Sequence, residues 1–465
     1  MIGTANEIAT AVRTGATSAR AIAEATIQRI ERTNPQLGAF TDLTRERAFL
    51  AADIVDARLK DGTDPGPLAG VPFAVKNLFD LKGLTTRAGS LINRENAPAQ
   101  TDATLVTRLE AAGAVCVGAL NMGEYAYDFT GENTHDGPSR NPHALDHMSG
   151  GSSGGSGTAV AGGLVPLALG SDTNGSIRVP ASLCGIFGLK PTYGRLSRAG
   201  TFPFVASLDH LGPLARSVSD LALAYDALQG QDAGDPHLAN RPTDPVAHRL
   251  GDGAEDLRIA VAGGYFKQMQ ESAATEAVVR VAAGLSVERA VEIADAATGR
   301  GAAYLITMAE GAALHLDRLR TRPDDFDPAV RDRLLAGAII PAAWVQKAQK
   351  VRRAYRDSLL ALFETVDVII APATPCRAPR LGQDTMTLDG ETMPVRPNLG
   401  LFTQPISCVG LPVVTVPVWT RGETLPIGVQ IIAPPWREDL ALRVARHLER
   451  LDVVAAPVAK GFAND

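Results

Sequence analysis

The spacing of hydrophobic residues near the start of the chain predicts three helices. Two lie within residues 5–35, as "NEIATAVRTG" and "SARAIAEATIQRIERTNP", and the third is "RERAFLAADIVDARLKDG". Ser18 is a typical N-cap residue for the second helix, and Gly15 stands where the first would end. We therefore expect N-terminal helices over residues 5–60.

Beyond this segment the pattern changes to short apolar runs bounded by Gly and Asp. Such runs are "GVPFAVKNLFD" (70–80), "AGAVCVGAL" (112–120) and "GLVPLALGSD" (163–172), and the helical stretch "ATLVTRLEAAG" lies between the first two. Strands that alternate with helices and are apolar throughout indicate an α/β sheet that is buried on both faces.

The second half of the chain begins with a segment that has few hydrophobic residues. Residues 231–256 are rich in Asp, Pro and Gly and predict a long surface connection. Strands are predicted again in "LRIAVAGG", "VDVIIAPAT", "LPVVTVPVW" and "IGVQIIAPP", and a last helix in "DLALRVARHLERL". The Ala-rich stretch up to about residue 363 favours helices that cover the sheet over an independent domain. We expect one domain over 1–465, with the catalytic core at about 65–230 and a C-terminal half at 257–465.

Composition narrows the class of protein. Hydrophobic residues make up 45% of the chain, enough for a sizeable core, and the net charge of −6 argues against direct nucleic-acid binding. The 4 cysteines form no CxxC pair, which favours reduced thiols in a cytoplasmic protein. We identify no signal peptide in "MIGTANEIATAVRTG" and expect no membrane-spanning segment.

The residues that can carry chemistry lie mainly between positions 76 and 176. The stretch "MSGGSSGGSGTAV" (148–160) has three interpretations. A phosphate-binding loop is disfavoured because no Gly-Lys-Ser/Thr follows, and a flexible linker here would leave backbone groups in the core unpaired. The third interpretation is a rigid catalytic loop, in which glycines let backbone N–H groups approach a substrate and serines supply hydroxyls.

A nucleophilic serine needs a base, and no histidine stands in the arrangement expected for an α/β-hydrolase elbow. His143 and His147 are four apart, but Pro142 and nearby glycines favour a solvated loop pair over a metal site, so we expect no metal and no cofactor. Lys76 ends an apolar run. Either it reaches out to water, or it is a buried neutral amine that acts as a base.

Three stretches together resemble the amidase signature family. They are the lysine in "PFAVKN" (Lys76), the double serine in "GGSSGGS" (Gly150–Ser156) and the serine that follows "DTNG" in "GSDTNGSIRVPASLCG" (Gly170–Gly185). The spacing from Ser152 to Ser176 also fits the family. The resemblance covers essentially the whole chain and implies a single α/β domain, built on a large twisted mixed β-sheet with helices on both faces.

This resemblance also implies roles for individual residues. Ser176 is the expected nucleophile, Ser152 passes its proton on, and Lys76 is the general base. A cis peptide bond is expected between Gly151 and Ser152, and Ser153 is expected to hydrogen-bond Lys76. Backbone N–H groups of four residues would form the oxyanion hole: Thr173, Asn174, Gly175 and Ser176.

Three further residues lie near the expected nucleophile. Asp172 and Arg178 either pair and brace the loop, or each cap a turn, and the sequence leaves both open. Cys184 could be proposed as an alternative nucleophile, but the apolar setting "SLCGIF" raises the pKa of a thiol.

Within the family, stretches such as "GRLSRAGTFPFVASLDHLGPLA" and "HLDRLRTRPDDFDP" resemble the branch that hydrolyses 1-carboxybiuret in cyanuric acid and s-triazine breakdown. Its substrate is an anionic, urea-like amide, and ammonia is released. The next resemblance is to the glutamine-hydrolysing component of tRNA-dependent amidotransferases, from whose pattern the chain departs at Asn174 and Val179. The resemblance implies a small partner subunit of the amidotransferase C type. A catalytically silent subunit that binds a small amide is the non-enzyme alternative; the presence of Lys76, Ser152 and Ser176 disfavours it.

An anionic substrate calls for a cation in the pocket. Helical spacing in "HLDRLRTRP" places His315, Arg318 and Arg322 on one face and Arg320 on another. We expect Arg320, with His315 as its neighbour, to meet the carboxylate, because an arginine can bind it through two hydrogen bonds. Two further substrate-binding residues are expected in "NMGEYAY": Met122 and Tyr125.

Overall fold

One mixed β-sheet of 11 strands runs through the computed structural model, which describes residues 3–463. In chain order its strands are β1 (Phe40–Leu43), β2 (Pro72–Lys76), β3 (Val115–Leu120), β6 (Leu167–Asp172), β7 (Phe187–Lys190), β8 (His210–Ala215), β9 (Ile259–Ala262), β10 (Ala290–Val291), β11 (Val368–Pro372), β14 (Val413–Val418) and β15 (Ile427–Ile432). Across the sheet the order is β1-β3-β2-β6-β8-β7-β14-β15-β11-β9-β10. Strands β3, β2 and β6 are parallel, as are β11, β9 and β10, and antiparallel pairs join the two sets. The predicted mixed sheet is confirmed.

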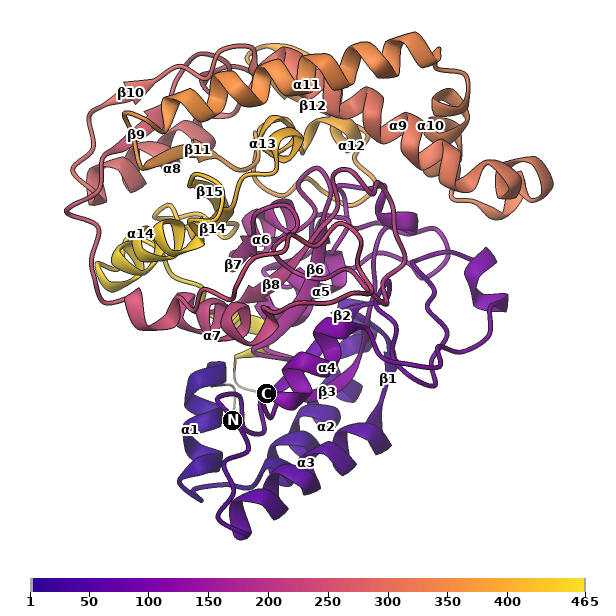
Figure 1. Ribbon diagram of the computed structural model, residues 1–465, viewed down its shortest axis with the longest axis vertical. Coiled ribbons are helices and arrows are strands. Elements are labelled where there is room, and N and C mark those ends of the chain that lie inside the picture. Colours follow the sequence, from indigo (N-terminus) through magenta and orange to yellow (C-terminus); the bar gives the residue numbers. More distant parts are fainter. Residues whose placement is uncertain (1–2, 464–465) are drawn as a thin grey trace.

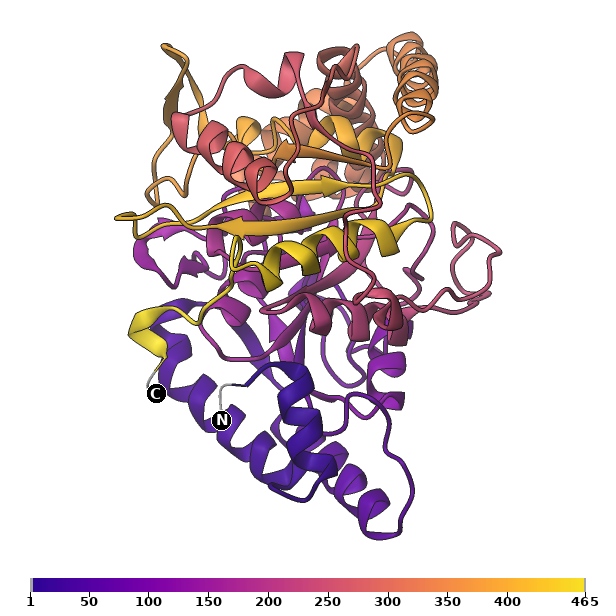
Figure 2. The same cartoon turned by 90° about the vertical axis from the view of Figure 1, so that its left-hand side faces the viewer.

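Helices cover both faces of this sheet, which explains why its central strands are apolar throughout. Every residue of β2, β6, β14 and β15 is buried. Figure 2 shows the last strands in yellow between α14 (Glu438–Arg450) on one side and α8 (Ser272–Gly284) on the other. Both helices contact β15.

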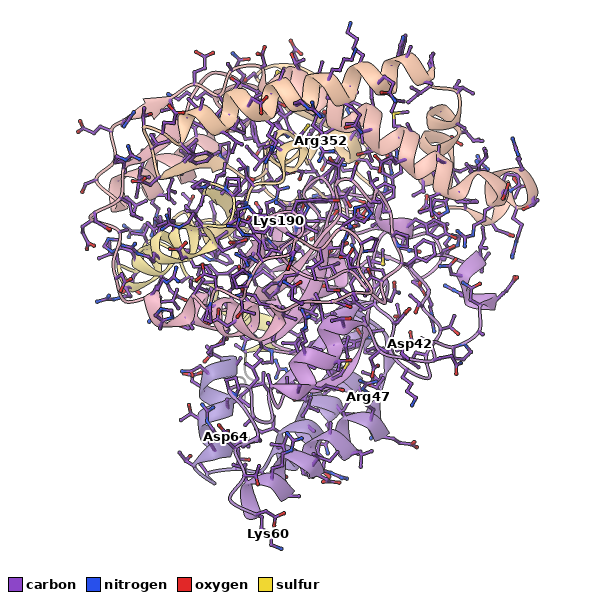
Figure 3. All side chains as sticks on the ribbon, viewed as in Figure 1. Asp42, Arg47, Lys60, Asp64, Lys190 and Arg352 are labelled. Atoms are coloured by element: carbon purple, nitrogen blue, oxygen red, sulfur yellow. The ribbon has the colours of Figure 1, made fainter. Side chains whose placement is uncertain are left out.

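The three predicted N-terminal helices are confirmed as α1 (Ala5–Arg13), α2 (Ala19–Leu37) and α3 (Arg45–Lys60), which lie together at one end of the molecule (Figure 1). Ser18 caps α2 as expected, since its Oγ accepts a hydrogen bond from Ala21 N at 3.0 Å. Arg47, labelled in Figure 3, joins α3 to α4 (Thr104–Ala111) and the loop before it, through ion pairs with Glu110 at 2.8 Å and Asp102 at 2.7 Å.

The remaining helices lie around the sheet and over its upper edge in Figure 1. They are α4 (Thr104–Ala111), α5 (Gly154–Ala161), α6 (Arg178–Cys184), α7 (Val218–Leu228), α9 (Ala296–Thr321), α10 (Pro328–Ala338), α11 (Ala342–Leu362), α12 (Val395–Asn398) and α13 (Gln404–Val409). Helix α9 packs against α10, α11 and α13, so the Ala-rich region forms an outer layer continuous with the rest of the fold. Residues 231–256 are mostly loop, with the single short helix η3 (Ala247–Arg249).

Some elements were not predicted. Strands β7 and β8 were not predicted, because "FGLK" is short and "HLGPLA" contains both Gly and Pro. These two strands join the two halves of the sheet. The hairpins β4 (Arg140–Asn141) with β5 (Ala144–Met148), and β12 (Thr385–Leu388) with β13 (Glu391–Pro394), were also missed. The first two and last two residues of the predicted domain lie outside the described residues. Among the described helices, none has the length and apolarity needed to cross a membrane.

Candidate active site

Lys76 is fully buried at the end of β2, and its amine lies between two serines. Nζ donates hydrogen bonds to Ser152 Oγ at 2.7 Å and to Ser171 Oγ at 2.8 Å. Strands β2 and β6 are parallel, with Val75 opposite Leu169, and so the side chains that follow both strands meet at one edge. Of the two possibilities that the sequence left open for Lys76, the structure shows the buried amine.

Burial lowers the pKa of Lys76 from 10.5 to about 7 because the charged form loses its hydration. Three carboxylates act in the opposite direction and keep the pKa from falling further: Asp172, Asp209 and Asp128. The amine therefore has a substantial neutral fraction near neutral pH, and a neutral amine can accept a proton.

The Gly-Ser stretch forms a tight loop that leads into α5. The peptide bond between Gly151 and Ser152 is cis, as the family resemblance implied. Gly151 donates its N–H to Phe129 O at 2.9 Å, and a Cβ at Gly151 would lie 2.3 Å from Asp128 Oδ2. Only a residue without a side chain fits against Asp128 here, so glycine fixes the position of Ser152 beside Lys76.

Ser176 lies in the loop between β6 and α6 and is 2% exposed. Gly175 has φ +143°, and a Cβ there would lie 2.2 Å from Thr403 Oγ1. That hydroxyl donates to Asn174 O at 2.7 Å. The loop is therefore fixed from the side of α13, and glycine is required where the two segments touch.

Asp172 and Arg178 form a buried ion pair across the same loop, so the bracing arrangement is the one present. Arg178 Nε and Nη2 donate to the two Asp172 oxygens at 2.9 and 3.0 Å, and neither side chain is exposed. Burial alone would raise the pKa of Asp172, but the charge and hydrogen bonds of Arg178 hold it well below its usual range. Arg178 also donates to Gln430 Oε1 at 2.7 Å and to Thr403 O at 3.0 Å.

Four consecutive backbone N–H groups in this loop have no acceptor among the described residues: those of Thr173, Asn174, Gly175 and Ser176. Unpaired buried N–H groups are rare in proteins. They belong to the same short loop as Ser176, and a run of unpaired N–H groups beside a serine can stabilise a developing oxyanion.

Two cavities adjoin the loop. A small one of about 20 Å³ is lined by Ser176, Asn174 and Tyr127 among others, and it has room for about one water molecule. A larger one of about 200 Å³ is lined by Ser171 and Thr173. Three residues line both cavities, which therefore adjoin each other: Ala126, Thr173 and Phe204.

The hydrogen bond expected between Ser153 and Lys76 is not present, and this expectation was wrong. Ser153 Oγ instead donates to Ser171 O and accepts from Ser171 N, each at 3.2 Å. The second partner of Lys76 is Ser171, which the sequence analysis missed because it sits inside an apolar strand run. Asp209 was missed too; it accepts a hydrogen bond from Thr173 Oγ1 at 2.6 Å.

The expected substrate-binding arginine lines neither cavity next to the Ser176 loop. Arg320 is exposed on α9, so the expected pairing of Arg320 with His315 is wrong. His315 contacts Arg318 instead, at 3.3 Å, on the face that the helical spacing predicted for these two residues. Burial lowers the pKa of His315 to about 3. The centroids of the His315 and Tyr125 rings lie 4.0 Å apart. Arg322 is paired with Glu95.

Met122 and Tyr125 are buried and line neither cavity next to the Ser176 loop. Tyr125 Oη is held by Ser90 Oγ at 2.7 Å and donates to Asn93 Oδ1 at 3.2 Å. These contacts hold Tyr125 in the core, while Tyr127, two positions further on, lines the small cavity.

The histidine pair and Cys184 do not form a second site. His143 lies 3.1 Å from Cys184 O, and His147 lies 2.7 Å from Asp146 Oδ1. No cluster of three metal-ligating side chains occurs in the described part of the chain. Cys184 is buried, and burial raises the pKa of its thiol far above the usual range, so the thiolate is disfavoured.

Comparison with known proteins places this geometry among amide hydrolases. The family model described as Amidase matches residues 21–442. The chain is 53% identical over 444 residues to the AtzE subunit of 1-carboxybiuret hydrolase from Pseudomonas sp. (strain ADP), covering 95% of this chain and 97% of that protein. It is 37% identical over 465 residues to the glutamyl-tRNA(Gln) amidotransferase A subunit of Acinetobacter baumannii, covering 93% and 92%.

Solved structures agree with these sequence matches. One, described as "An unexpected vestigial protein complex reveals the evolutionary origins of an s-triazine catabolic enzyme", has a TM-score of 0.97 at 52% identity and covers 98% of this chain and 100% of that one. A 6-aminohexanoate cyclic dimer hydrolase complexed with substrate has a TM-score of 0.89 at 29% identity, with 99% of each chain covered.

Proposed function

The chain belongs to the amidase signature family, whose members act on C–N bonds of amides, and from this premise we propose that it hydrolyses 1-carboxybiuret and releases ammonia. The observation that carries the proposal is the buried amine of Lys76, 2.7 Å from the hydroxyl of Ser152 and near the loop that presents Ser176. The 53% identical relative supports this choice of substrate.

In the proposed mechanism Ser176 transfers its hydroxyl proton to Ser152. Ser152 at the same time transfers its own proton to the neutral amine of Lys76. Ser176 Oγ attacks the terminal amide carbon, and the four unpaired N–H groups of residues 173–176 bind the oxyanion. The proton returns through Ser152 to the leaving nitrogen, and the C–N bond breaks. Ammonia leaves, and water then hydrolyses the acyl-serine, so that a carboxylate replaces the terminal amide and Ser176 regains its proton.

Ammonia release from a set of small amides tests this proposal. The purified chain should release ammonia from freshly prepared 1-carboxybiuret faster than from biuret, malonamide or glutamine. Faster turnover of glutamine would instead favour the amidotransferase alternative, which the 37% identical relatives support. Absence of turnover of all four amides would favour a catalytically silent subunit.

Variants of two buried serines test the nucleophile. We expect Ser176→Ala to abolish ammonia release and labelling by a fluorophosphonate. Ser156→Ala is the matched control, because Ser156 is equally buried but its hydroxyl donates to Leu169 O at 3.0 Å. Labelling that maps to Cys184 or Ser153 would contradict the assignment of Ser176.

A small partner subunit of the amidotransferase C type is a further part of the proposal. It is supported by the structure described as a vestigial protein complex and by the family resemblance. Co-expression with a short helical subunit should give a stable complex on size exclusion, with higher yield or activity. Full activity of a monomeric chain, measured with light scattering, would count against it. A cytoplasmic setting also belongs to this proposal, and the four cysteines are free and buried.

A further inference from the structure

The N–H groups of the loop at residues 173–176 take their directions from the carbonyl groups that precede them. In a trans peptide the C=O and the N–H point in opposite directions, so a contact that holds the oxygen also aims the N–H. The one cis peptide bond among the described residues precedes Ser152, and the peptides of this loop are therefore trans. What binds the carbonyl oxygens decides where these N–H groups point.

Two of the carbonyl oxygens are held by elements that adjoin the loop. Gly175 O accepts from Val179 N at 2.7 Å, and this turn at the start of α6 aims the N–H of Ser176. His210 Nδ1, on β8, lies 3.0 Å from Asp172 O, and it carries the proton because a carbonyl oxygen only accepts. This contact aims the N–H of the peptide that follows Asp172.

The peptide between Asn174 and Gly175 is held by a residue that is distant in the sequence. Thr403, which precedes α13, donates its hydroxyl to Asn174 O at 2.7 Å. The hydroxyl oxygen also lies 3.1 Å from Gly400 O. Because 2.7 Å is the usual length of an O–H···O hydrogen bond, and two oxygens repel each other at that distance without a proton between them, the hydrogen belongs to the shorter contact. The N–H of Gly175 consequently points away from Thr403.

The place of Thr403 in the fold gives independent evidence that its hydroxyl serves the loop. Thr403 is the N-cap residue of α13. At that position a threonine hydroxyl usually accepts a hydrogen bond from a backbone N–H in the first turn of the helix. The side chain of Thr403 makes no such capping hydrogen bond. Its hydroxyl is buried and is directed at Asn174 O instead.

Other contacts fix Thr403 against the loop. Arg178 Nη1 donates to Thr403 O at 3.0 Å, and Arg178 is itself bound to Asp172. Gly175 allows the close approach, since a Cβ there would lie 2.2 Å from Thr403 Oγ1. Thr403 therefore contacts the loop through both its backbone carbonyl and its hydroxyl, and neither contact includes a group that takes part in bond making or proton transfer.

We propose that Thr403 is a positioning residue: by holding Asn174 O it aims the N–H of Gly175 at the oxyanion that forms on the substrate. The inference rests on the proposed hydrolysis at Ser176. The oxyanion exists in the transition state and not in the bound amide, so a well-aimed N–H raises kcat and contributes little to substrate binding. A threonine that only packed α13 against the loop would affect stability without this division between kcat and KM.

Thr403→Val tests the proposal, because valine has the shape of threonine and cannot donate a hydrogen bond. Removing one oxyanion donor costs about 10²–10³ in rate, and for a donor that is wrongly aimed we expect kcat for 1-carboxybiuret to fall about 50-fold. KM should stay within about threefold of the wild type. Thr403→Ser keeps the hydroxyl and should keep kcat. Wild-type kcat in a folded Thr403→Val protein, or an equal loss in Thr403→Ser, would overturn the proposal.

Thr33→Val in α2 is the matched control. Thr33 is buried too, and its hydroxyl also donates to a backbone carbonyl, Arg29 O, at 2.8 Å. Helix α2 lies in the lower part of Figure 1 and α13 in the upper part, so the control loses the same kind of hydrogen bond away from the loop. We expect its midpoint of urea unfolding to fall while kcat stays unchanged. An equal fall of kcat in Thr33→Val would show that activity follows stability, and it would overturn the proposal.

A further variant covers the case in which Thr403→Val does not fold. Valine places a methyl group against Asn174 O, whereas Thr403→Ala removes the hydroxyl and leaves space there. We expect Thr403→Ala to fold and to show the same loss of kcat with KM nearly unchanged. Wild-type kcat in Thr403→Ala would contradict the role of the hydroxyl.

The rate of fluorophosphonate labelling separates this inference from the proposed substrate. When Ser176 Oγ attacks phosphorus and fluoride leaves, the phosphonyl oxygen takes the place of the oxyanion, so no amide substrate is needed. We expect the second-order rate constant to fall about 50-fold in Thr403→Ala and to be kept in Thr403→Ser. If the wild type is labelled in this pattern but does not hydrolyse 1-carboxybiuret, only the proposed substrate fails. If the wild type and Thr403→Ala are labelled equally fast, the role of Thr403 fails.

Discussion

Replacing Lys76 with methionine removes the proposed base and leaves a side chain of similar length in the same buried space. Lys76 Nζ lies 2.7 Å from Ser152 Oγ, and Met offers no atom there that can accept a proton. General-base catalysis contributes about 10²–10⁴-fold to a rate. We therefore expect kcat for ammonia release to fall by at least about 10³-fold in a protein that still folds.

The pH dependence of the wild type gives a second measure of the same residue. With a pKa of about 7, about half of the Lys76 amine is neutral at pH 7. With the ordinary value of 10.5, only about one molecule in 3,000 would be neutral. We expect kcat/KM to rise about tenfold per pH unit below pH 7 and to level off above it, because only the neutral amine accepts a proton.

The same substitution should raise stability while it lowers activity. The folded state lowers the pKa of Lys76, so between about pH 7 and 10.5 the unfolded chain binds a proton that the folded chain does not. Wild-type stability therefore rises with pH across that window, and below pH 7 the buried charge costs up to about 5 kcal/mol. Lys76→Met removes this cost and loses two hydrogen bonds worth about 1 kcal/mol each. We expect a higher melting temperature than the wild type near pH 7 and a difference that shrinks toward pH 10.

Steady-state ammonia assays from pH 5 to 9 and thermal denaturation of both proteins check these expectations. A folded Lys76→Met protein with kcat within tenfold of the wild type would refute the role of Lys76 as base. A wild-type profile that is flat between pH 6 and 8 would refute the neutral buried amine.

Two more substitutions probe the groups that hold the reacting residues. Ser171→Ala removes the second hydrogen-bond partner of Lys76, which lies 2.8 Å from Nζ. We expect kcat to fall about tenfold. The inflection of the pH profile should move to lower pH, because the charged amine loses a hydrogen-bond acceptor. An unmoved inflection would show that Ser171 does not act on Lys76. Gly175→Ala places a Cβ 2.2 Å from Thr403 Oγ1 at φ +143°, and we expect a loss of at least about 100-fold in kcat with destabilisation of about 2 kcal/mol. Chemical denaturation and kinetics measure both effects, and wild-type activity in Gly175→Ala would contradict the tight contact at this loop.

The parts of the site that follow a local pattern were predictable from the sequence. Lys76 was singled out by its position at the end of an apolar run, and the Gly-Ser stretch by its composition, whereas the roles of Ser152 and Ser176 came from the resemblance to the amidase signature family. The N-cap Ser18 and the apolar strands β2, β3 and β6 follow from the same kind of local rule.

The parts that depend on pairing between distant segments were not predictable. Ser171 reaches Lys76 only because β2 and β6 pair in a particular register. Arg320 was wrongly expected to bind the substrate carboxylate. Helical spacing assigns residues to different faces of a helix, but it does not show which face packs against the rest of the protein.

The ion pair that braces the Ser176 loop has a consequence for protein synthesis. Arg178 is held by Thr403 and Gln430, which follow it by 225 and 252 positions. A chain still attached to the ribosome therefore carries every reacting group long before it contains the residues that fix the nucleophile. A message that ends before β15 is translated yields a polypeptide that has Lys76, Ser152 and Ser176 but lacks the Gln430 contact of Arg178. We expect such a polypeptide to be inactive.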